Sequence, residues 1–296
     1  MSPDRAYARC EQIAAAHYEN FPVASRLLPA RMRPHVAAVY AFARAADDFA
    51  DEGTAPEAQR LAWIDEWRTL RGADVARVRE APGVGHVSAG DVQAIFVATR
   101  DTIARCQLDP GLFDDLLSAF AQDVTVRRYA TWDAVLDYCR RSANPVGRLV
   151  LGIAGVRDQA AAVQSDAVCT ALQLTNFWQD LGDDWTRRDR LYVPEDLLAR
   201  CGARAATLDG DVPDDAWRMV MEELGRRTFV LFETGRPVCN AVRGRLRYEL
   251  RATWLGGTTV LRRTLALRQH SLHERPALGR WDMMRIAAGT LLRAHC

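Results

Sequence analysis

A group of polar side chains between residues 40 and 51 has the spacing needed to bind a cation beside an anion. Tyr40, Arg44, Asp47 and Asp51 are separated by four, three and four residues, so a helix would place them on one face. Asp47 and Asp51 are like charges one turn apart, and their repulsion destabilises an isolated helix. A divalent cation between the two carboxylates would remove that repulsion. The alternative is a solvated acidic helix end, which is common on protein surfaces.

A second group of oxygen ligands lies later in the chain. Asn176, Asp180 and Asp184 repeat every four residues, which predicts three oxygen ligands in one stripe along a helix. Carboxylate and amide oxygens are hard ligands that suit Mg²⁺. The apolar residues off this stripe can anchor the same helix in a core. We therefore expect Mg²⁺ as the cofactor.

Two acidic helices that faced each other across a cavity would hold a diphosphate, because Mg²⁺ bridges a few protein carboxylates to phosphate oxygens. Arginine side chains would complete such an anion site with their forked donors. The candidates near the two motifs are Arg44, Arg187, Arg188 and Arg190. The alternative for the run at residues 187–190 is a solvated helix end.

The elements that must position these residues are helices. Apolar residues recur at three- and four-residue spacing, and no useful β alternation occurs. Pro34 and Gly53 predict the start and end of the first acidic helix, and the glycine-rich residues 73–90 predict a loop. The other predicted helices cover residues 56–72, 91–106, 110–127, 131–155, 158–185, 213–235, 237–269 and 281–294. No linker or repeat divides them, so we predict one all-α domain over residues 1–296, with its helices around a central cavity.

The composition excludes several classes of protein. Of the 296 residues, 49% are hydrophobic and 26% are charged, and the net charge of +1 argues against a nucleic-acid binder. All 39 basic residues are arginine, so mechanisms that need a Schiff-base or P-loop lysine are excluded. No GxGxxG fingerprint is present, and we expect no nicotinamide cofactor.

The cysteines and the apolar stretches bear on the compartment. The seven cysteines are widely spaced without a CxxC pair, which predicts reduced thiols rather than a disulfide framework or a zinc site. Charged residues stand at the N-terminus where a secretory signal needs an apolar stretch, and no apolar stretch is long enough to span a bilayer. We expect a cytoplasmic protein and leave open a peripheral contact with the inner face of the membrane.

Several motifs together resemble the squalene/phytoene synthase family, from about residue 17 to residue 292. They are Tyr-x3-Arg-x2-Asp-Asp-x2-Asp at residues 40–51, Asn-x3-Asp-x3-Asp at residues 176–184 and Arg-x-Tyr-x-Pro at residues 190–194. The segment at residues 138–148, and Asp123 followed by Arg128-Tyr129, match the family as well. The resemblance implies an all-α, Mg²⁺-dependent enzyme that acts on isoprenyl diphosphates in head-to-head chemistry.

The resemblance also implies roles for individual residues. The Mg²⁺ ligands would be Asp47, Asp51, Asn176, Asp180 and Asp184. Tyr40 and Arg44 would contact the diphosphate. The remaining substrate contacts would come from Phe21, Tyr138, Ala143, Val146, Gly147, Gln173, Arg190 and Tyr192.

Two segments depart from the wider family and are similar to one bacterial subgroup, which makes hydroxysqualene in the hopanoid route. Tyr18-Glu19-Asn20-Phe21 replaces a Ser-x-Ser-Phe run, and Asn144-Pro145 replaces a Gly-Thr-like pair. Proline at position 145 is expected to kink the predicted helix. The implied reaction ionises presqualene diphosphate, rearranges the cyclopropylcarbinyl cation and captures it with water in an apolar, aromatic pocket. The polar candidates for directing the water are Asn20, Tyr138, Asn144 and Arg148.

Two alternatives remain open. The family also condenses two farnesyl or geranylgeranyl diphosphates to presqualene diphosphate, squalene or phytoene. In a different class, the chain would be a non-catalytic helical interaction scaffold, and Asp47→Ala or Asp180→Ala would be harmless. As partners we expect a prenyl diphosphate substrate, no nucleic acid, and functional coupling to upstream and downstream squalene-pathway enzymes.

Overall fold

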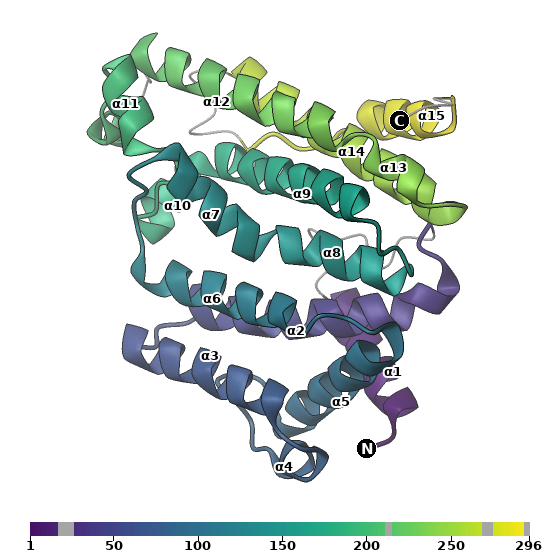
Figure 1. Cartoon of the computed structure of the whole chain (residues 1–296). Helices are drawn as coiled ribbons and strands as arrows, with labels where there is room; N and C mark the ends of the chain where they lie inside the picture. Colours follow the sequence, from purple (N-terminus) through teal and green to yellow (C-terminus); the bar gives the residue numbers. More distant parts are fainter. Residues whose placement is uncertain (17–26, 211–214, 268–274, 293–296) are drawn as a thin grey trace. The chain divides into compact units, whose positions relative to one another are not determined.

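The computed structural model describes residues 1–16, 27–210, 215–267 and 275–292, and Figure 1 shows that they are built from helices. Within these residues, β pairing is limited to two isolated bridges, Val84 with Val87 and Arg128 with Leu191. The prediction of an all-α fold is confirmed. Among the described helices, none combines the length and the apolarity needed to cross a membrane.

The chain forms two compact units whose segments alternate along the sequence. The first unit comprises Met1–Thr125 and Pro145–Arg157, and the second comprises Val126–Asn144 and Asp158–Cys296. The first acidic motif therefore belongs to the first unit, and the second motif belongs to the second unit. That residues 1–296 act as one domain stays a prediction.

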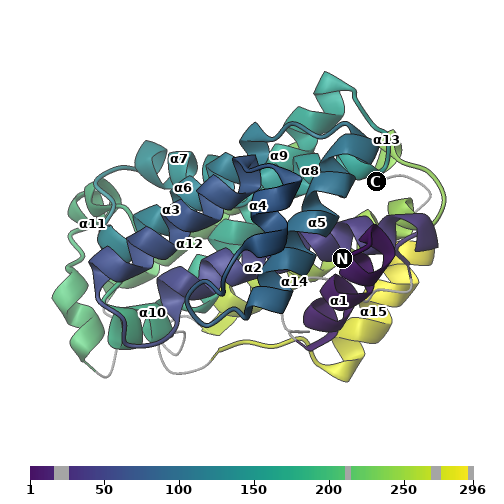
Figure 2. The ribbon, with the colours of Figure 1, turned by 90° about the horizontal axis from the view of Figure 1, so that it is seen from below.

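In the first unit, α2 (Arg33–Asp51) is the central helix. It packs against α1 (Pro3–Ala16), α3 (Glu57–Gly72), α5 (Ala89–Cys106) and α6 (Gly111–Thr125), and a short 3-10 turn, η2 (Ala30–Met32), leads into it. Both ribbon views show α1 beside α5 (Figure 1, Figure 2). Because neighbours cover α2 on several sides, most of its apolar residues are buried.

Aromatic rings fill the contacts of α2 and fix which of its faces is left for polar residues. The ring of Phe42 lies 5.1 Å from that of Phe113 on α6 and 5.8 Å from that of Phe96 on α5, between centroids. All three side chains are fully buried. Burying side chains of this size contributes about 1.5–3 kcal/mol each. Asp51 follows Phe42 by nine residues, which turns it to the opposite side of the helix.

The boundaries of α2 agree with the prediction. Pro34 lies in its first turn, and Gly53 follows its end with a φ of 78°. A φ of this sign is easily adopted by glycine and strains most other residues.

The prediction of a loop over residues 73–90 is wrong in part. Val75–Glu80 form the short helix α4, and the Asp74 side chain caps it by accepting the backbone N–H of Arg77. A tight turn over residues 84–87 follows, closed by two backbone hydrogen bonds between Val84 and Val87. The helix signal was obscured because the capped segment is short and is flanked by glycine and proline.

In the second unit, α9 (Gln159–Gln179) is the central helix. It packs against α7 (Trp132–Ser142), α12 (Asp215–Gly235) and α14 (Arg245–Leu267), and α14 packs against α15 (Arg280–Leu292). Figure 1 shows α9, α12 and α14 running alongside one another. The shorter elements of this unit are α10 (Leu181–Arg188), α11 (Glu195–Cys201), η3 (Ala205–Asp209) and α13 (Val238–Ala241).

A glycine allows α14 to approach α9 and α12 closely. A Cβ at Gly257 would lie 2.5 Å from the Leu172 side chain and 2.8 Å from the Phe232 ring. Ordinary carbon contacts need about 3.5–4.0 Å. The close packing of the three helices therefore depends on this glycine.

Three predicted helices are interrupted. The helix expected over residues 131–155 is two helices, α7 and α8 (Asn144–Ile153), which meet at Ala143. Pro145 falls in the first turn of α8, where its missing N–H removes no intrahelical hydrogen bond. The proline thus separates two helices instead of kinking one. Likewise, the helix expected over residues 237–269 is divided into α13 and α14, and Gly244 between them has a φ of 62°.

The helix expected over residues 158–185 ends at Gln179, and α10 begins at Leu181. Asp180 joins the two helices with φ −100° and ψ 11°, outside the helical region. The four-residue period of the motif predicted a continuous helix, and this prediction is wrong at the middle residue of the motif.

The cysteines depart from the prediction at one position. Among the described residues, five cysteines form no disulfide: Cys10, Cys106, Cys139, Cys169 and Cys201. Cys239 is disulfide-bonded, so the prediction of reduced thiols is wrong for this residue. Wide spacing in the sequence does not determine which thiols come together in a folded chain.

Candidate active site

The first acidic motif lies on the last two turns of α2. Asp47 and Asp51 are one helical turn apart, and the Asp47 side chain is 37% exposed. Burial and the like charges of Asp51 and Asp123 raise the pKa of Asp47 above its ordinary value, although nearby Arg44 opposes the rise. Asp123 lies on α6 and is itself buried. The crowding of carboxylates creates negative charge that a bound cation would compensate.

Arg44 is held among carboxylates of its own helix. Its Nη2 lies 2.6 Å from Oδ1 of Asp48 and 2.8 Å from Oε1 of Glu52, and its Nη1 lies 3.6 Å from Oδ2 of Asp47. Tyr40, one turn earlier, is half-buried. Asp48 and Glu52 were not singled out from the sequence, although they follow Arg44 at helical spacings of four and eight residues. Arg44, which was predicted to bind an anion, therefore lies at the acidic face of α2 and forms ion pairs with carboxylates there.

The second acidic motif keeps its one-turn spacing across the break at Asp180. The backbone N–H of Asp180 donates to the carbonyl of Asn176 at 2.8 Å, and that of Asp184 donates to the carbonyl of Asp180 at 2.8 Å. These i to i+4 bonds continue the helical ladder from α9 into α10. Asn176 is exposed, and the Asp180 and Asp184 side chains are 26% and 11% exposed. The three predicted ligands thus occupy successive turns, with exposure decreasing along the motif.

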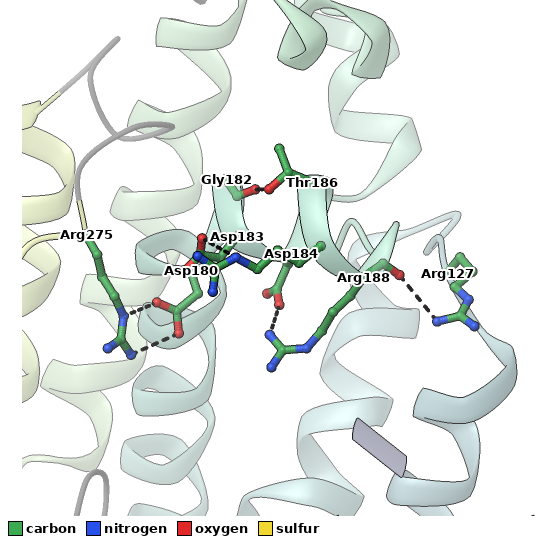
Figure 3. Close-up of polar contacts among 9 residues, drawn as sticks. Arg127, Asp180, Gly182, Asp183, Asp184, Thr186, Arg188 and Arg275 are labelled. Atoms are coloured by element: carbon green, nitrogen blue, oxygen red, sulfur yellow. Dashed lines mark hydrogen bonds and ion pairs between the residues drawn. The ribbon is translucent and has the colours of Figure 1, made fainter. Parts of the chain in front are cut away.

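An arginine from far along the chain holds the central ligand of this motif. The Nε and Nη2 of Arg275 donate to the two carboxylate oxygens of Asp180, at 2.5 and 3.2 Å (Figure 3). The side-chain amide of Gln179 donates to the carbonyl of Pro276 at 2.5 Å, so two neighbouring residues attach the segment after residue 274 to the α9–α10 junction. Sequence reasoning missed Arg275, because nothing local links it to a residue 95 positions earlier.

Asp184 is also engaged by arginine. Nη1 of Arg188 donates to Oδ1 of Asp184 at 3.0 Å, one turn along α10 (Figure 3). The backbone N–H of Arg190 donates to the carbonyl of Asp184 at 3.0 Å, and the Arg190 side chain is buried. Burial and the charge of Asp180 raise the pKa of Asp184 to about 6, against the opposing effect of Arg188 and Arg190. Of the predicted anion donors, Arg188 and Arg190 are therefore close to the motif.

Arg187 is placed differently. Its Nε lies 3.5 Å from Oδ1 of Asp183, and both side chains are exposed. Asp183 is not one of the predicted ligands. Arg187 fits the solvated helix end that was the alternative for this arginine run.

Four aromatic rings gather beside the second motif. Phe177 and Tyr192 are stacked, with centroids 3.6 Å apart and planes 7° from parallel. The Tyr138 ring lies 5.8 Å from that of Phe177 and 5.7 Å from that of Tyr192, and the Tyr129 ring lies 5.4 Å from that of Tyr192. All four are buried. Tyr138 and Tyr192 were predicted to line the substrate site, and the structure brings them together.

Backbone pairing explains how distant aromatic residues meet. The N–H of Leu191 donates to the carbonyl of Arg127 at 2.9 Å, which sets residues 127–129 beside residues 190–192. Phe177 follows Asn176 directly, so the rings adjoin the acidic stripe. Sequence reasoning treated Phe177 only as a core residue and gave Tyr129 no role of its own. The available signal was an aromatic residue next to a predicted ligand.

Asn144 is tied to α9, the helix that carries Asn176. The hydroxyl of Thr170 donates to Oδ1 of Asn144 at 2.9 Å, and both residues are buried. Thr170 precedes Asn176 by six residues, which places the two about 120° apart around the helix. The hydrogen bond therefore holds Asn144 beside a point on α9 that lies about 9 Å of helical rise before Asn176. Gln173, between them, is half-buried.

The remaining predicted residues have different positions. Ala143, Val146 and Gly147 are half-buried near the α7–α8 junction, and Arg148 on α8 is exposed. Val146, Gly147 and Arg148 belong to the first unit, whereas Tyr138 and Asn144 belong to the second. Asn20 and Phe21, which were predicted as a water-directing and a substrate-contacting residue, lie outside the described residues.

Among the described residues, no group of three or more His, Cys, Asp and Glu side chains is arranged to hold a metal ion by itself. Each motif supplies oxygen donors, and neighbouring arginines form ion pairs with carboxylates in both motifs. Such a donor set suits a hard cation that takes part of its coordination from phosphate oxygens and water.

Comparison with known proteins identifies what this arrangement resembles. The model of the squalene/phytoene synthase family matches residues 14–282. The hydroxysqualene synthase of Sinorhizobium fredii is 36% identical over 238 residues, which are 80% of this chain and 76% of that protein. The phytoene synthase of Arthrospira platensis is 30% identical over 245 residues, which cover 77% of this chain and 75% of that protein. The crystal structure of squalene synthase HpnC from Alicyclobacillus acidocaldarius matches with a TM-score of 0.77 and 35% identity, covering 91% of this chain and 95% of that chain.

Proposed function

Because this chain belongs to the squalene/phytoene synthase family, we propose that it is a hydroxysqualene synthase, which converts presqualene diphosphate to hydroxysqualene. The family makes it an isoprenoid synthase that acts on a prenyl diphosphate. The observation that carries the finer assignment is the higher identity to a hydroxysqualene synthase, 36%, than to a phytoene synthase, 30%. The acidic stripe beside four buried aromatic rings supports the same chemistry.

The proposed Mg²⁺ ligands are Asp47 and Asp51 on α2, and Asn176, Asp180 and Asp184 at the α9–α10 junction. Their donors are all oxygens. Burial, together with neighbouring carboxylates, raises the pKa of Asp47 and of Asp184, and a bound cation would stabilise the ionised form of both. These residues therefore fit a hard divalent cation. When bound, Mg²⁺ supplies Lewis-acid stabilisation of the leaving diphosphate.

Arginine residues complete the proposed diphosphate contacts. Arg44, Arg188 and Arg190 have guanidinium groups beside the acidic motifs, and Tyr40 lies one turn from Arg44. Arg44 and Arg188 now pair with carboxylates, so binding of a diphosphate requires them to exchange or share those partners. Guanidinium donors recognise phosphate oxygens in forked geometry and stabilise the charge that develops as the diphosphate leaves.

The aromatic cluster is the proposed environment of the carbocation. After the carbon–oxygen bond to diphosphate breaks, its electron pair leaves with the diphosphate, and the cyclopropylcarbinyl cation rearranges. The rings of Tyr129, Tyr138, Phe177 and Tyr192 exclude water and present π faces that stabilise a cation. Water then forms a new carbon–oxygen bond and loses one proton. The step consumes no reductant, in agreement with the expectation of no nicotinamide cofactor.

For the direction of water we propose Asn144 and Tyr138 before the other candidates. Asn144 is buried and held by Thr170, so its amide has a fixed position. Arg148 is exposed and has less support, and Asn20 stays a prediction. The proposed apolar lining includes Phe21, Ala143, Val146, Gly147 and Gln173. If Asn144→Gly gave only hydroxysqualene at the normal rate, Asn144 would have no part in directing water.

The experiment that tests the function uses the purified full chain with Mg²⁺. It is incubated with presqualene diphosphate or with farnesyl diphosphate, and the products are identified by mass spectrometry. We expect hydroxysqualene from the first substrate and no product from the second. A cyclopropyl diphosphate from farnesyl diphosphate would instead support the head-to-head condensation, which the 30% identity to a phytoene synthase keeps as a second candidate. Absence of any Mg²⁺-dependent product or binding would favour the non-catalytic scaffold.

We propose that the enzyme works in the cytoplasm at the inner membrane face. Its substrate must come from a reaction that joins two prenyl diphosphates, and its product must pass to an enzyme that accepts an apolar C30 alcohol. Functional coupling to such upstream and downstream enzymes would limit the exposure of both compounds to water.

A further inference from the structure

Helix α15 exposes an unusual amount of apolar surface. Its exposed large side chains are Trp281 at 76%, Met283 at 55%, Met284 at 61%, Leu291 at 72% and Leu292 at 82%. These residues all lie within one helix of 13 residues. In the described chain, no other helix exposes as many large hydrophobic side chains. A surface helix ordinarily presents polar residues to solvent, so this exposed face requires a partner.

The opposite side of α15 is fixed against α14. Nη2 of Arg263 lies 2.5 Å from Oδ2 of Asp282, and Nη1 of Arg251 donates to the carbonyl of Thr290 at 3.5 Å. Ile286, between these two contacts, is buried. Figure 1 shows α15 lying next to α14. The apolar residues therefore face outward because the other face is attached at both ends.

The charges near this face have one sign. The α15 residues include two basic side chains, Arg280 and Arg285, both exposed, and a single acid, Asp282. Asp282 is buried and paired with Arg263, so it does not contribute to the outer face. Arg262 on α14 is exposed as well, but its guanidinium lies over the Phe229 ring of α12, 5.4 Å from the ring centroid, so it is not counted with this face. The outer face of α15 thus combines tryptophan, methionine and leucine with arginine.

We propose that α15 docks on the surface of an anionic lipid bilayer. Tryptophan and leucine insert at the boundary between headgroups and acyl chains, and arginine binds anionic headgroups. A helix of 13 residues is about 20 Å long, too short to span a bilayer, so it lies along the surface. A second copy of the chain fits less well, because pairing two such faces brings arginines together with no exposed acid of α15 to meet them.

The inference deepens the proposed function and rests on it in one respect: an apolar C30 product needs a route into lipid. The binding itself follows from α15 and can be measured without any substrate. Failure of catalysis and failure of membrane docking are therefore distinguishable.

The test is flotation of the full chain with vesicles of phosphatidylcholine alone or mixed with phosphatidylglycerol. We expect binding to the mixed vesicles that weakens with salt, because headgroup attraction is screened. A double substitution, Trp281→Ser with Leu292→Ser, should lower the partition coefficient by roughly tenfold or more, since it removes two inserting side chains. Arg280→Gln with Arg285→Gln should reduce binding to the mixed vesicles alone.

The matched control is Met219→Ser with Val230→Ser, which changes two exposed hydrophobic residues of α12. It should leave binding unchanged. Circular dichroism confirms folding, and activity on detergent-dispersed substrate should persist in every variant. The proposal is overturned if the chain binds neither vesicle, if the α15 variants bind like the parent chain, or if sedimentation shows a dimer that the α15 substitutions dissociate.

Discussion

Arg275 holds both carboxylate oxygens of Asp180, the middle residue of the second acidic motif, at 2.5 and 3.2 Å. The pair links the segment before α15 to the junction of α9 and α10. If Asp180 is a Mg²⁺ ligand, the guanidinium competes with the cation for the same oxygens. Arg275 would then be free to contact the diphosphate once the cation has taken its place.

The first prediction concerns this competition. Arg275→Gln should raise the affinity for Mg²⁺ alone several-fold, because a charged competitor is removed from Asp180. The same variant should weaken binding of inorganic diphosphate with Mg²⁺. Isothermal titration calorimetry measures both. Arg187→Gln is the matched control, since it breaks an arginine–aspartate pair on the same helix junction without touching a proposed ligand. Equal Mg²⁺ affinity in both variants would exclude the competition.

The second prediction separates ligand from neighbour within one motif. Asp180→Asn should lower kcat by roughly 100-fold or more, since loss of one charged ligand weakens stabilisation of the leaving group. Asp183→Asn should keep nearly full activity, because Asp183 is exposed and pairs with Arg187. Steady-state kinetics with saturating Mg²⁺ give the comparison. A similar loss in both variants would mean that the effect arises from the charge of the segment.

The third prediction is a pH dependence of stability in the presence of EDTA. The pKa of Asp184 is raised from 3.8 to about 6, chiefly by burial. Between these pH values the folded chain keeps a proton that the unfolded chain has lost, so the free energy of unfolding falls as pH rises. The Asp184→Asn variant has no carboxyl group at this position, so its free energy of unfolding does not fall for this reason. Relative to the parent chain, its free energy of unfolding should rise by at most about 3 kcal/mol across this window.

Urea unfolding at a series of pH values measures that difference. Asp183→Asn serves as the control, and its curve should run parallel to that of the parent chain. Parallel curves for Asp184→Asn as well would contradict the raised pKa.

The fourth prediction concerns the stacked rings. Tyr192→Phe should keep the stack on Phe177 and most of the activity. Tyr192→Leu should lower kcat by roughly tenfold or more and release alcohols in which the cyclopropane ring survives, because water reaches the cation before it rearranges. Gas chromatography with mass spectrometry of the products distinguishes the two. An unchanged product from Tyr192→Leu would remove the ring from the cation environment.

The fifth prediction uses two adjacent glycines of α14. A Cβ at Gly257 would lie 2.5 Å from Leu172, whereas one at Gly256 would have its nearest neighbour, Leu278, at 4.0 Å. Gly257→Ala should lower the free energy of unfolding by about 1–3 kcal/mol through overpacking. Gly256→Ala should raise it by about 0.5–1 kcal/mol through helix propensity. Thermal or urea unfolding measures the stability of the two variants. Equal changes in their free energies of unfolding would contradict the close packing at Gly257.

Local patterns were enough to predict the helical class and most of the proposed ligands. The recurrence of apolar residues every three or four positions was enough to predict the long helices. The four-residue period places Asp47 with Asp51, and Asn176 with Asp180 and Asp184, on successive turns, because a helix returns to the same side after about one turn. The motifs were also sufficient to indicate the family, which the comparisons then established.

Contacts between residues distant in the chain could not be predicted from local patterns. The pairing of Arg275 with Asp180, the stack of Phe177 on Tyr192 and the tie of Thr170 to Asn144 join different elements, and no local period encodes them. The break at Asp180 and the outward face of α15 likewise depend on which neighbours pack against each helix. The helices and the spacing of the carboxylates follow from local sequence, since backbone geometry acts over a few residues. Packing determined the charge partners, the buried rings and the exposed surfaces, since burial and ion pairing depend on the whole fold.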